Sequence, residues 1–197
     1  MKLNDFLKKM PKAVFSWHEA SRVAWTTSAG VLRLDLHNWV KRGELIRLKR
    51  GLYLVPNRNA SKVDIARALY SPAYLSLEWA LHQHGLLPDV VFALTLVSSR
   101  STRSFKTPLG EFIYHKIKSS LFFGYDSDTL LAEPEKALVD IFYIRGGSFV
   151  PKTSFWDEMR WQNLDKLDFT KAKQYAKASG VAKVNQLVES LHRYAKT

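Results

Sequence analysis

The sequence predicts an α+β fold in three consecutive parts. Residues 1–58 show the order helix, short turn, helix and hairpin. Residues 59–150 show two helices, three or four strands and a further helix, which is typical of a small α+β layer. Residues 151–197 show helical patterns alone. We therefore expect a winged helix-turn-helix, a central α+β domain, and a helical tail packed on the central domain.

Two helices joined by a short polar turn open the first part. Ser16 can cap the first helix, and Glu19, three residues later, completes a capping box. The turn ends at Ser28, which can cap a second helix over residues 31–42. Gly43 is a natural stop for that helix. This order is the helix-turn-helix pattern.

The second helix has an apolar and a polar face. At about 100° per residue, Arg33, His37 and Lys41 share one side, with Asn38 beside them. These residue types read base edges and phosphates in a DNA major groove. The face that we expect in the core is formed by Leu32, Leu36, Trp39 and Val40.

Two further residues of this helix bear on the interpretation. Leu34 falls on the polar side, where it would either touch a thymine methyl or pack on the first helix. Packing is the interpretation that we favour. Asp35 lies off the basic stripe, which helps because a carboxylate facing phosphate would be repelled.

A basic hairpin follows the second helix. Apolar runs over residues 44–48 and 52–55 flank Lys49, Arg50 and Gly51, which predicts a hairpin with a basic tip. A hairpin in this place is a wing, and wing cations usually contact backbone phosphate. The alternative is that these charges only form a solvated surface.

Formal charge is concentrated in the same segment. Residues 1–58 hold 12 Lys and Arg against 4 Asp and Glu, residues 59–150 hold 9 against 9, and residues 151–197 hold 9 against 5. A basic module joined to a neutral one is the electrostatic pattern of nucleic-acid-binding chains. The residues that we predict to contact double-stranded DNA are Thr27, Ser28, Arg33, His37, Asn38, Lys41, Arg42, Lys49 and Arg50.

The central part combines helices with a sheet. We expect a short helix over residues 61–69, a helix capped by Ser71-Pro72 that runs to about His84, and a strand over residues 90–97. A hairpin should span residues 103–117, with a type I turn at Thr107-Pro108-Leu109-Gly110. A buried helix should cover residues 133–145.

The tail reads as three helices, over residues 154–161, 170–178 and 181–194. The last carries one apolar stripe, which is too short for a coiled coil of several heptads. The stripe is formed by Val184, Leu187, Val188 and Leu191.

Catalytic and metal-binding patterns are weak. The chain has no Cys, and it shows no phosphate-binding Gly motif. His82 and His84 are two apart on a helix, so they point in different directions. A nuclease would gather carboxylates and a lysine around Mg²⁺. The imaginable set has no compelling spacing: Glu111, Lys116, Glu133, Glu135 and Lys136. We therefore expect no enzyme activity, no metal and no cofactor.

A loop over residues 98–104 is rich in hydroxyls and holds Arg100 and Arg103. These two cations could hold phosphate or an acidic partner. The alternative is a solvated loop. The chain shows neither a signal peptide nor a membrane-spanning run, and its lack of Cys fits a reducing compartment, so we expect a cytoplasmic protein without a membrane partner.

Three strings resemble the AbiEi antitoxin family, the transcriptional regulators of abortive-infection, type IV toxin–antitoxin systems. Residues 39–53 (WVKRGELIRLKRGLY) are similar to its winged-helix module. Residues 70–78 (YSPAYLSLE) and 133–140 (EPEKALVD) are similar to recurring strings of its second region. The likeness covers roughly residues 15–145.

This resemblance implies a repressor that binds promoter DNA, represses its own operon and opposes a nucleotidyltransferase toxin. Type IV antitoxins need not contact their toxin, so no physical complex is implied. The alternative from another class is an enzyme, a nuclease or nucleic-acid modifier that finds its substrate through the winged helix.

Overall fold

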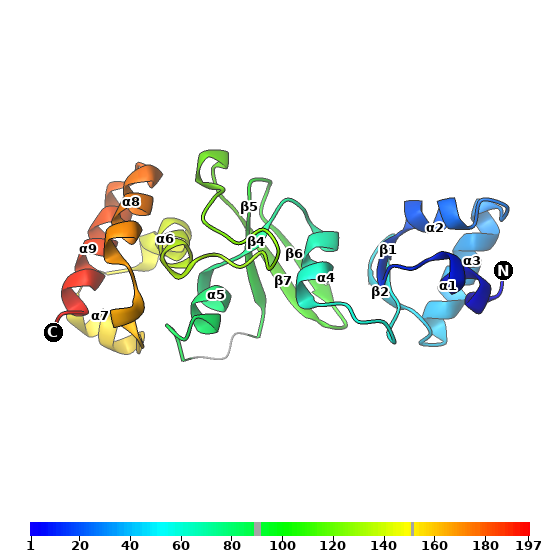
Figure 1. Cartoon of the computed structure of the whole chain (residues 1–197), viewed down its shortest axis with the longest axis horizontal. Helices are drawn as coiled ribbons and strands as arrows, with labels where there is room; N and C mark the ends of the chain where they lie inside the picture. The colour runs from blue at the N-terminus through cyan, green and yellow to red at the C-terminus, as the bar shows by residue number, and fades with distance from the viewer. Residues whose placement is uncertain (89–91, 151) are drawn as a thin grey trace. The chain divides into compact units, whose positions relative to one another are not determined.

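The computed structural model describes residues 1–88, 92–150 and 152–197, which fold as an α+β protein in two compact units (Figure 1). The first unit comprises Met1–Ser71 with Phe105–Gly110, and the second comprises Pro72–Ser104 with Glu111–Thr197. Each unit is described by itself.

The first unit combines helices with a small antiparallel sheet. Its sheet has the order β1-β3-β2. The elements are α1 (Leu3–Lys9), β1 (Val14–Ser16), α2 (Trp17–Val23), α3 (Ala29–Lys41), β2 (Ile46–Lys49), β3 (Leu52–Leu54) and α4 (Lys62–Leu69). Two consecutive helices, α2 and α3, and the hairpin β2–β3 lie where the sequence predicts them, whereas α1 and β1 were not predicted.

Local capping explains where α2 and α3 begin. The Ser16 hydroxyl accepts from the backbone N–H of Glu19 at 3.3 Å, and the Glu19 carboxylate accepts from the backbone N–H of Ser16 at 2.8 Å. The Ser28 hydroxyl accepts from the N–H of Val31 at 3.4 Å. Both caps agree with the sequence prediction. Lys12 and the Ser16 contacts lower the pKa of Glu19 to about 2.

One core holds this unit together. Phe6 of α1 lies with its ring centroid 5.4 Å from that of Phe15 and 5.3 Å from that of Trp39. Helix α1 and strand β1 therefore complete the core beneath α3, although both are too short to show a clear period in the sequence. The buried cluster is Phe6, Met10, Phe15, Ala20, Ala24, Leu32, Leu36, Trp39, Leu45 and Val55.

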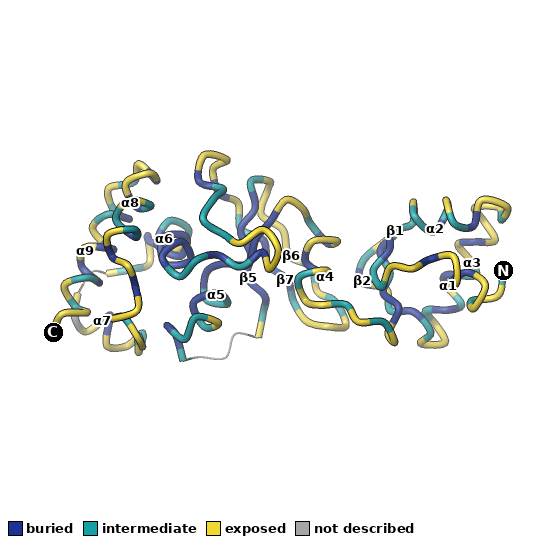
Figure 2. The backbone as a smooth tube through the Cα atoms, in the orientation of Figure 1, coloured by how far each residue is buried: buried dark blue, intermediate teal, exposed yellow. Residues whose placement is uncertain are grey.

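The second unit contains β4 (Tyr74–Leu75), α5 (Leu77–Gln83) and β5 (Leu94–Ser98). The four-stranded sheet has the order β4-β5-β7-β6, with β6 at Arg103–Thr107 and β7 at Gly110–Lys116. The residues Phe105–Gly110 of its β6–β7 hairpin are counted with the first unit. Strand β5 pairs antiparallel with β4 and parallel with β7, and it is buried along its whole length (Figure 2). The turn between β6 and β7 lies where the sequence predicts it.

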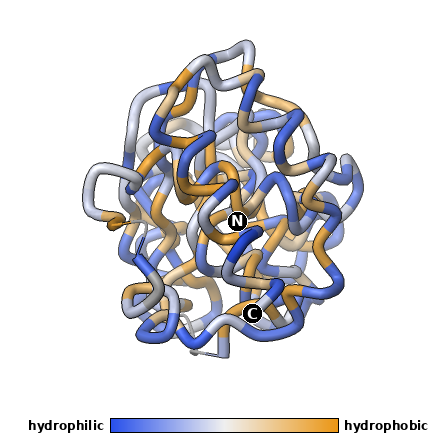
Figure 3. Tube along the Cα trace, turned by 90° about the vertical axis from the view of Figure 1, so that its left-hand side faces the viewer, coloured by the Kyte–Doolittle hydropathy of each residue, from blue (hydrophilic) through white to orange (hydrophobic). Residues whose placement is uncertain are grey.

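Helices build the remainder of the second unit. Helix α6 packs against α5 and against two later helices, α8 and α9. Hydrophilic and hydrophobic residues alternate along the chain trace (Figure 3). Helices α8 and α9 each bury one face, whereas α6 is buried continuously from Glu135 to Phe142. The elements are η1 (Ser119–Leu121), α6 (Pro134–Arg145), η2 (Gly146–Ser148), α7 (Thr153–Glu158), η3 (Leu164–Lys166), α8 (Phe169–Ser179) and α9 (Ala182–Tyr194).

Two expectations for the central part need correction. The prediction that a helix opens at Ser71-Pro72 is wrong, because Tyr74–Leu75 form β4 and the helix starts only after Ser76. Extended backbone there lets the Ser76 N–H donate to the carbonyl of Thr95 at 3.1 Å. The strand expected over residues 90–97 begins at Leu94, and its predicted start at residues 90 and 91 lies outside the described residues.

Candidate nucleic-acid interface

Helix α3 presents a basic face to solvent. Arg33, His37 and Lys41 are exposed, and they follow one another at one-turn spacing. The opposite side of α3 is fixed in the core by Leu32, Leu36 and Trp39, each at most 2% exposed. Burial of that side determines which residues of α3 are exposed to solvent.

A groove of about 820 Å³ runs beside this face, and we call it the α3–hairpin groove. It brings together three arginines from different elements: Arg33 from α3, Arg47 from β2 and Arg50 from the hairpin turn. Among the described residues that line it, none is acidic. The groove is lined by Trp17, His18, Arg33, His37, Val40, Arg47, Arg50, Gly51 and Tyr53. Such a concentration of guanidinium groups suits phosphate oxygens, which they bind in bidentate fashion.

Trp17 connects the walls of this groove. Its backbone N–H donates to the carbonyl of Gly51 at 2.8 Å, which ties the hairpin turn to the start of α2. The guanidinium carbon of Arg33 lies 5.2 Å from the centroid of the Trp17 ring. Gly51 has φ +75°, a conformation that a side chain would strain. These contacts hold the cations of α3 and of the hairpin in a fixed relation.

Six of the nine residues predicted to bind DNA do not line this groove, namely Thr27, Ser28, Asn38, Lys41, Arg42 and Lys49. Asn38 and Arg42 line a second groove, together with Asp35 and Glu44. There the Arg42 guanidinium pairs with the Glu44 carboxylate at 2.7 Å. Asn38 is half-buried. Because Asn38 lies five residues from Arg33, the helix turns it toward a different flank.

In the hairpin, Arg47 lines the groove, whereas Lys49, which was predicted to bind DNA, does not. The Lys49 ammonium donates to the carbonyl of Leu69 and lies 4.9 Å from the centroid of the Phe105 ring, so it is engaged within the first unit. Arg47, which was not predicted, is exposed and lines the α3–hairpin groove. The alternation along β2, with Leu48 buried, could have revealed Arg47 from its period of two.

The turn before α3 serves mainly local structure. The Thr27 N–H donates to the carbonyl of Ala24 at 2.8 Å, and Ser28 is occupied as the cap of α3. The expectation that Leu34 packs on the first helix is wrong, because this residue is 59% exposed.

A buried ionic cluster occupies the second unit at the strings YSPAYLSLE and EPEKALVD. Lys136 and Asp140 form an ion pair, and both are at most 1% exposed. Tyr74 and Ser76 donate their hydroxyls to the Asp140 carboxylate at 2.9 and 2.8 Å. Burial lowers the pKa of Lys136 and raises the pKa of Asp140. The cluster joins β4 to α6.

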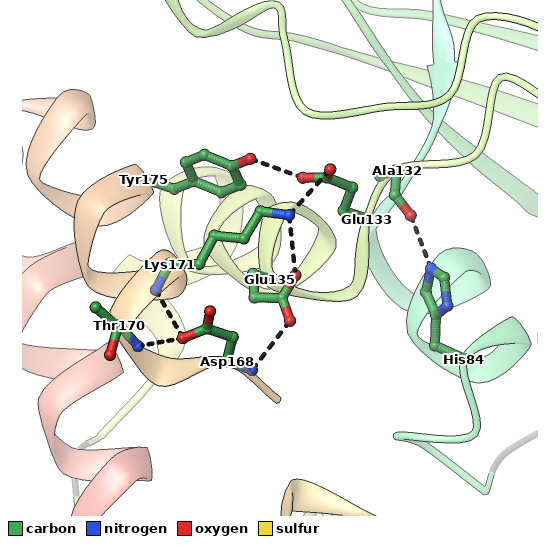
Figure 4. Close-up of polar contacts among 8 residues, drawn as sticks. All are labelled: His84, Ala132, Glu133, Glu135, Asp168, Thr170, Lys171 and Tyr175. Carbon is green, nitrogen blue, oxygen red and sulfur yellow. Dashed lines mark hydrogen bonds and ion pairs between the residues drawn. The ribbon is translucent and has the colours of Figure 1, made fainter. Parts of the chain in front are cut away.

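The two glutamates of EPEK contact helix α8 and its N-cap (Figure 4). The Glu133 carboxylate accepts from the Tyr175 hydroxyl at 2.7 Å and pairs with the Lys171 ammonium at 3.0 Å. The Glu135 carboxylate accepts from the backbone N–H of Asp168 at 3.1 Å. Asp168 in turn caps α8. These contacts turn the two carboxylates toward α8.

The candidate nuclease residues are therefore dispersed among other partners. The Glu111 carboxylate accepts from the Ser104 hydroxyl at 2.9 Å, and Lys136 belongs to the buried cluster. Within residues 1–88, 92–150 and 152–197, no group of three or more His, Asp or Glu side chains is placed to hold a metal ion.

The two arginines of the hydroxyl-rich loop lie at the surface. Arg100 is exposed, with its backbone N–H donating to the Ser98 hydroxyl at 3.2 Å. Arg103 is exposed at the first position of β6. Of the helices in the described part of the chain, none has both the length and the apolar character that crossing a membrane requires.

Comparison with known proteins finds a family match for one segment of the chain. No curated protein sequence matches the chain. Residues 25–56, which contain α3 and the hairpin β2–β3, match the model of a family described as transcriptional regulator, AbiEi antitoxin. The predicted resemblance to this family is thereby confirmed over residues 25–56.

Proposed function

We propose that the chain is a DNA-binding transcriptional repressor whose residues 1–58 form a winged helix-turn-helix. The observation that carries this proposal is the α3–hairpin groove, in which Arg33, Arg47 and Arg50 line one space and none of the described lining residues is acidic. In this arrangement α3 is the recognition helix and β2–β3 is the wing. The match of residues 25–56 to a family of transcriptional regulators supports the same role.

Duplex binding by the full chain tests the proposal. Affinity for a duplex that carries the promoter upstream of its own gene should fall steeply with salt, with a slope of about 0.9 per neutralised phosphate. Arg33→Ala and Arg50→Ala should weaken binding. Lys177→Ala removes an exposed cation of α8 and should leave binding unchanged. Salt-independent or absent binding by the folded chain contradicts the proposal.

Autoregulation is the biological form of this activity. We propose that the chain represses its own operon, because the matched family consists of antitoxin regulators. A reporter under the upstream promoter should be repressed by the wild-type chain and released by Arg33→Ala. Equal repression by both would place regulation outside this groove.

The second unit is proposed to supply the antitoxin activity, against a nucleotidyltransferase toxin, without direct contact being required. The surface to test first is Arg100 with Arg103, both exposed. Co-expression of the double alanine variant with the neighbouring nucleotidyltransferase should lower rescue of growth while promoter repression persists. Full rescue by that variant would show that this loop is only a solvated surface.

The proposed role is regulatory rather than catalytic, in the cytoplasm. Incubation with Mg²⁺ or Mn²⁺ and plasmid, single-stranded DNA or tRNA should leave these substrates intact. Cleavage that disappears in Glu111→Ala or Glu135→Ala would support the nuclease alternative instead.

A further inference from the structure

Helix α3 exposes two aliphatic side chains among its cations. Leu34 is 59% exposed and Val31 is 49% exposed. Residues three apart lie on the same face of a helix, so the two form one apolar strip. Exposed leucine is ordinary when isolated, but here it lies within the face proposed to meet DNA.

Leu34 lies directly opposite the core side of α3. At 100° per residue, its direction is close to the reverse of the mean direction of Leu32, Leu36 and Trp39, which are buried. Lys41, two turns along, shares its direction, and His37 lies next to it. An aliphatic side chain therefore points away from the core in the middle of α3, with cations on its flank.

The backbone before Leu34 is open as well. Gly30 lies one turn earlier, and apart from its two chain neighbours and the adjacent backbone of α3, no described atom comes within 4 Å of the position that its Cβ would take. A ligand can therefore approach the first turns of α3 closely, with Leu34 and Val31 as the leading side chains.

A polyanion with an apolar feature suits this face. The DNA major groove offers such a feature in the C5-methyl group of thymine, and apolar side chains recognise it. A protein partner suits the face less well, because it would have to cover the charges of Arg33, His37 and Lys41 along with the leucine.

We propose that Leu34, supported by Val31, reads a thymine methyl group in the major groove and so makes this chain prefer sites with thymine at that position. This inference rests on the proposed DNA-binding function. Burying one methyl group is worth about 0.8 kcal/mol, which corresponds to about fourfold in affinity.

The experiment uses the full-length chain and the duplex that it enriches most from a randomised pool. Each thymine of that duplex is replaced in turn by deoxyuracil, which removes only the methyl group. At one or two positions the wild-type chain should lose about fourfold in affinity. Leu34→Ala should bind the unmodified duplex more weakly and lose the distinction between thymine and deoxyuracil there. Leu109→Ala, a matched exposed leucine in the β6–β7 turn, should keep that distinction.

The outcomes separate the inference from the function beneath it. If binding depends on salt but replacing thymine by deoxyuracil does not change the affinity, the proposal that Leu34 recognises a thymine methyl group is wrong. The DNA-binding proposal is then unaffected. A deoxyuracil effect that persists in Leu34→Ala also overturns the proposal for Leu34. Failure to enrich any duplex contradicts the DNA-binding proposal itself. If Leu34→Ala keeps full DNA affinity but abolishes self-association, the strip is a protein contact and the inference is wrong.

Discussion

The guanidinium carbon of Arg33 lies 5.2 Å from the centroid of the Trp17 ring. Trp17 itself packs on the buried core of the first unit and donates its N–H to the carbonyl of Gly51. A cation of α3 is thus supported by a side chain that is anchored in the fold and tied to the hairpin turn. This support restricts the arginine before any ligand arrives, which reduces the ordering cost of binding.

Trp17→Leu should therefore weaken DNA binding through Arg33. A cation–π contact is worth about 0.5–1 kcal/mol, so affinity for the selected duplex should fall about two- to fivefold. Arg33→Ala should cost about 1–3 kcal/mol. The double variant should bind no more weakly than Arg33→Ala alone, as measured by fluorescence anisotropy. Additive losses would show that Trp17 acts independently of Arg33.

Substitutions of the hairpin cations should have different effects, because Arg47 and Arg50 line the groove whereas Lys49 is engaged by other residues. Arg47→Ala and Arg50→Ala should each lower the slope of log affinity against log salt by about 0.9. Lys49→Met should lower thermal stability instead, because its ammonium is engaged by Leu69 and Phe105. Arg42→Ala is the matched control, since that guanidinium pairs with Glu44 and lines the other groove. A slope change for Arg42 equal to that for Arg47 would contradict the assignment of the α3–hairpin groove.

The buried ion pair of the second unit should dominate its stability. Lys136→Met leaves the Asp140 carboxylate buried without its cation and should lower the free energy of unfolding by about 3–5 kcal/mol. Lys136→Met combined with Asp140→Leu should recover most of that loss. Lys171→Met, which breaks a partly exposed pair with Glu133, should cost about 1 kcal/mol or less. Urea unfolding measures all three, and equal losses for the two single variants would contradict this ranking.

Acid should weaken the first unit through Glu19. Its pKa is lowered to about 2 in the folded chain, by Lys12 first and then by Ser16, from an ordinary value of 4.5. A depressed carboxylate pKa stabilises the fold fully above pH 4.5, and this contribution is lost as the pH falls toward 2. Glu19→Gln should cost about 1 kcal/mol near neutral pH and show a shallower decline over that range. Glu158→Gln, at an exposed carboxylate, is the control and should follow the wild-type curve.

Features that depend on neighbours within one or two turns were determined by the sequence alone. The caps at Ser16 and Ser28 need a partner only three residues away, so the start of α2 and the helical phase of α3 were readable. The alternation of buried and exposed positions then identified Arg33 and His37 as surface residues. The match over residues 25–56 falls on this same segment.

Features that depend on distant partners were decided only by the tertiary structure. Lys49 is engaged because a carbonyl 20 residues later lies beside it. Tyr74 extends into a strand because β5 and the Asp140 carboxylate, 66 residues away, bond to that segment. Local propensity carries no information on these contacts, whereas burial makes unpaired polar groups costly, so the packed fold overrides the local pattern. Distant partners also explain why Arg47 lines the groove and Lys49 does not, since the Lys49 ammonium contacts Phe105 instead.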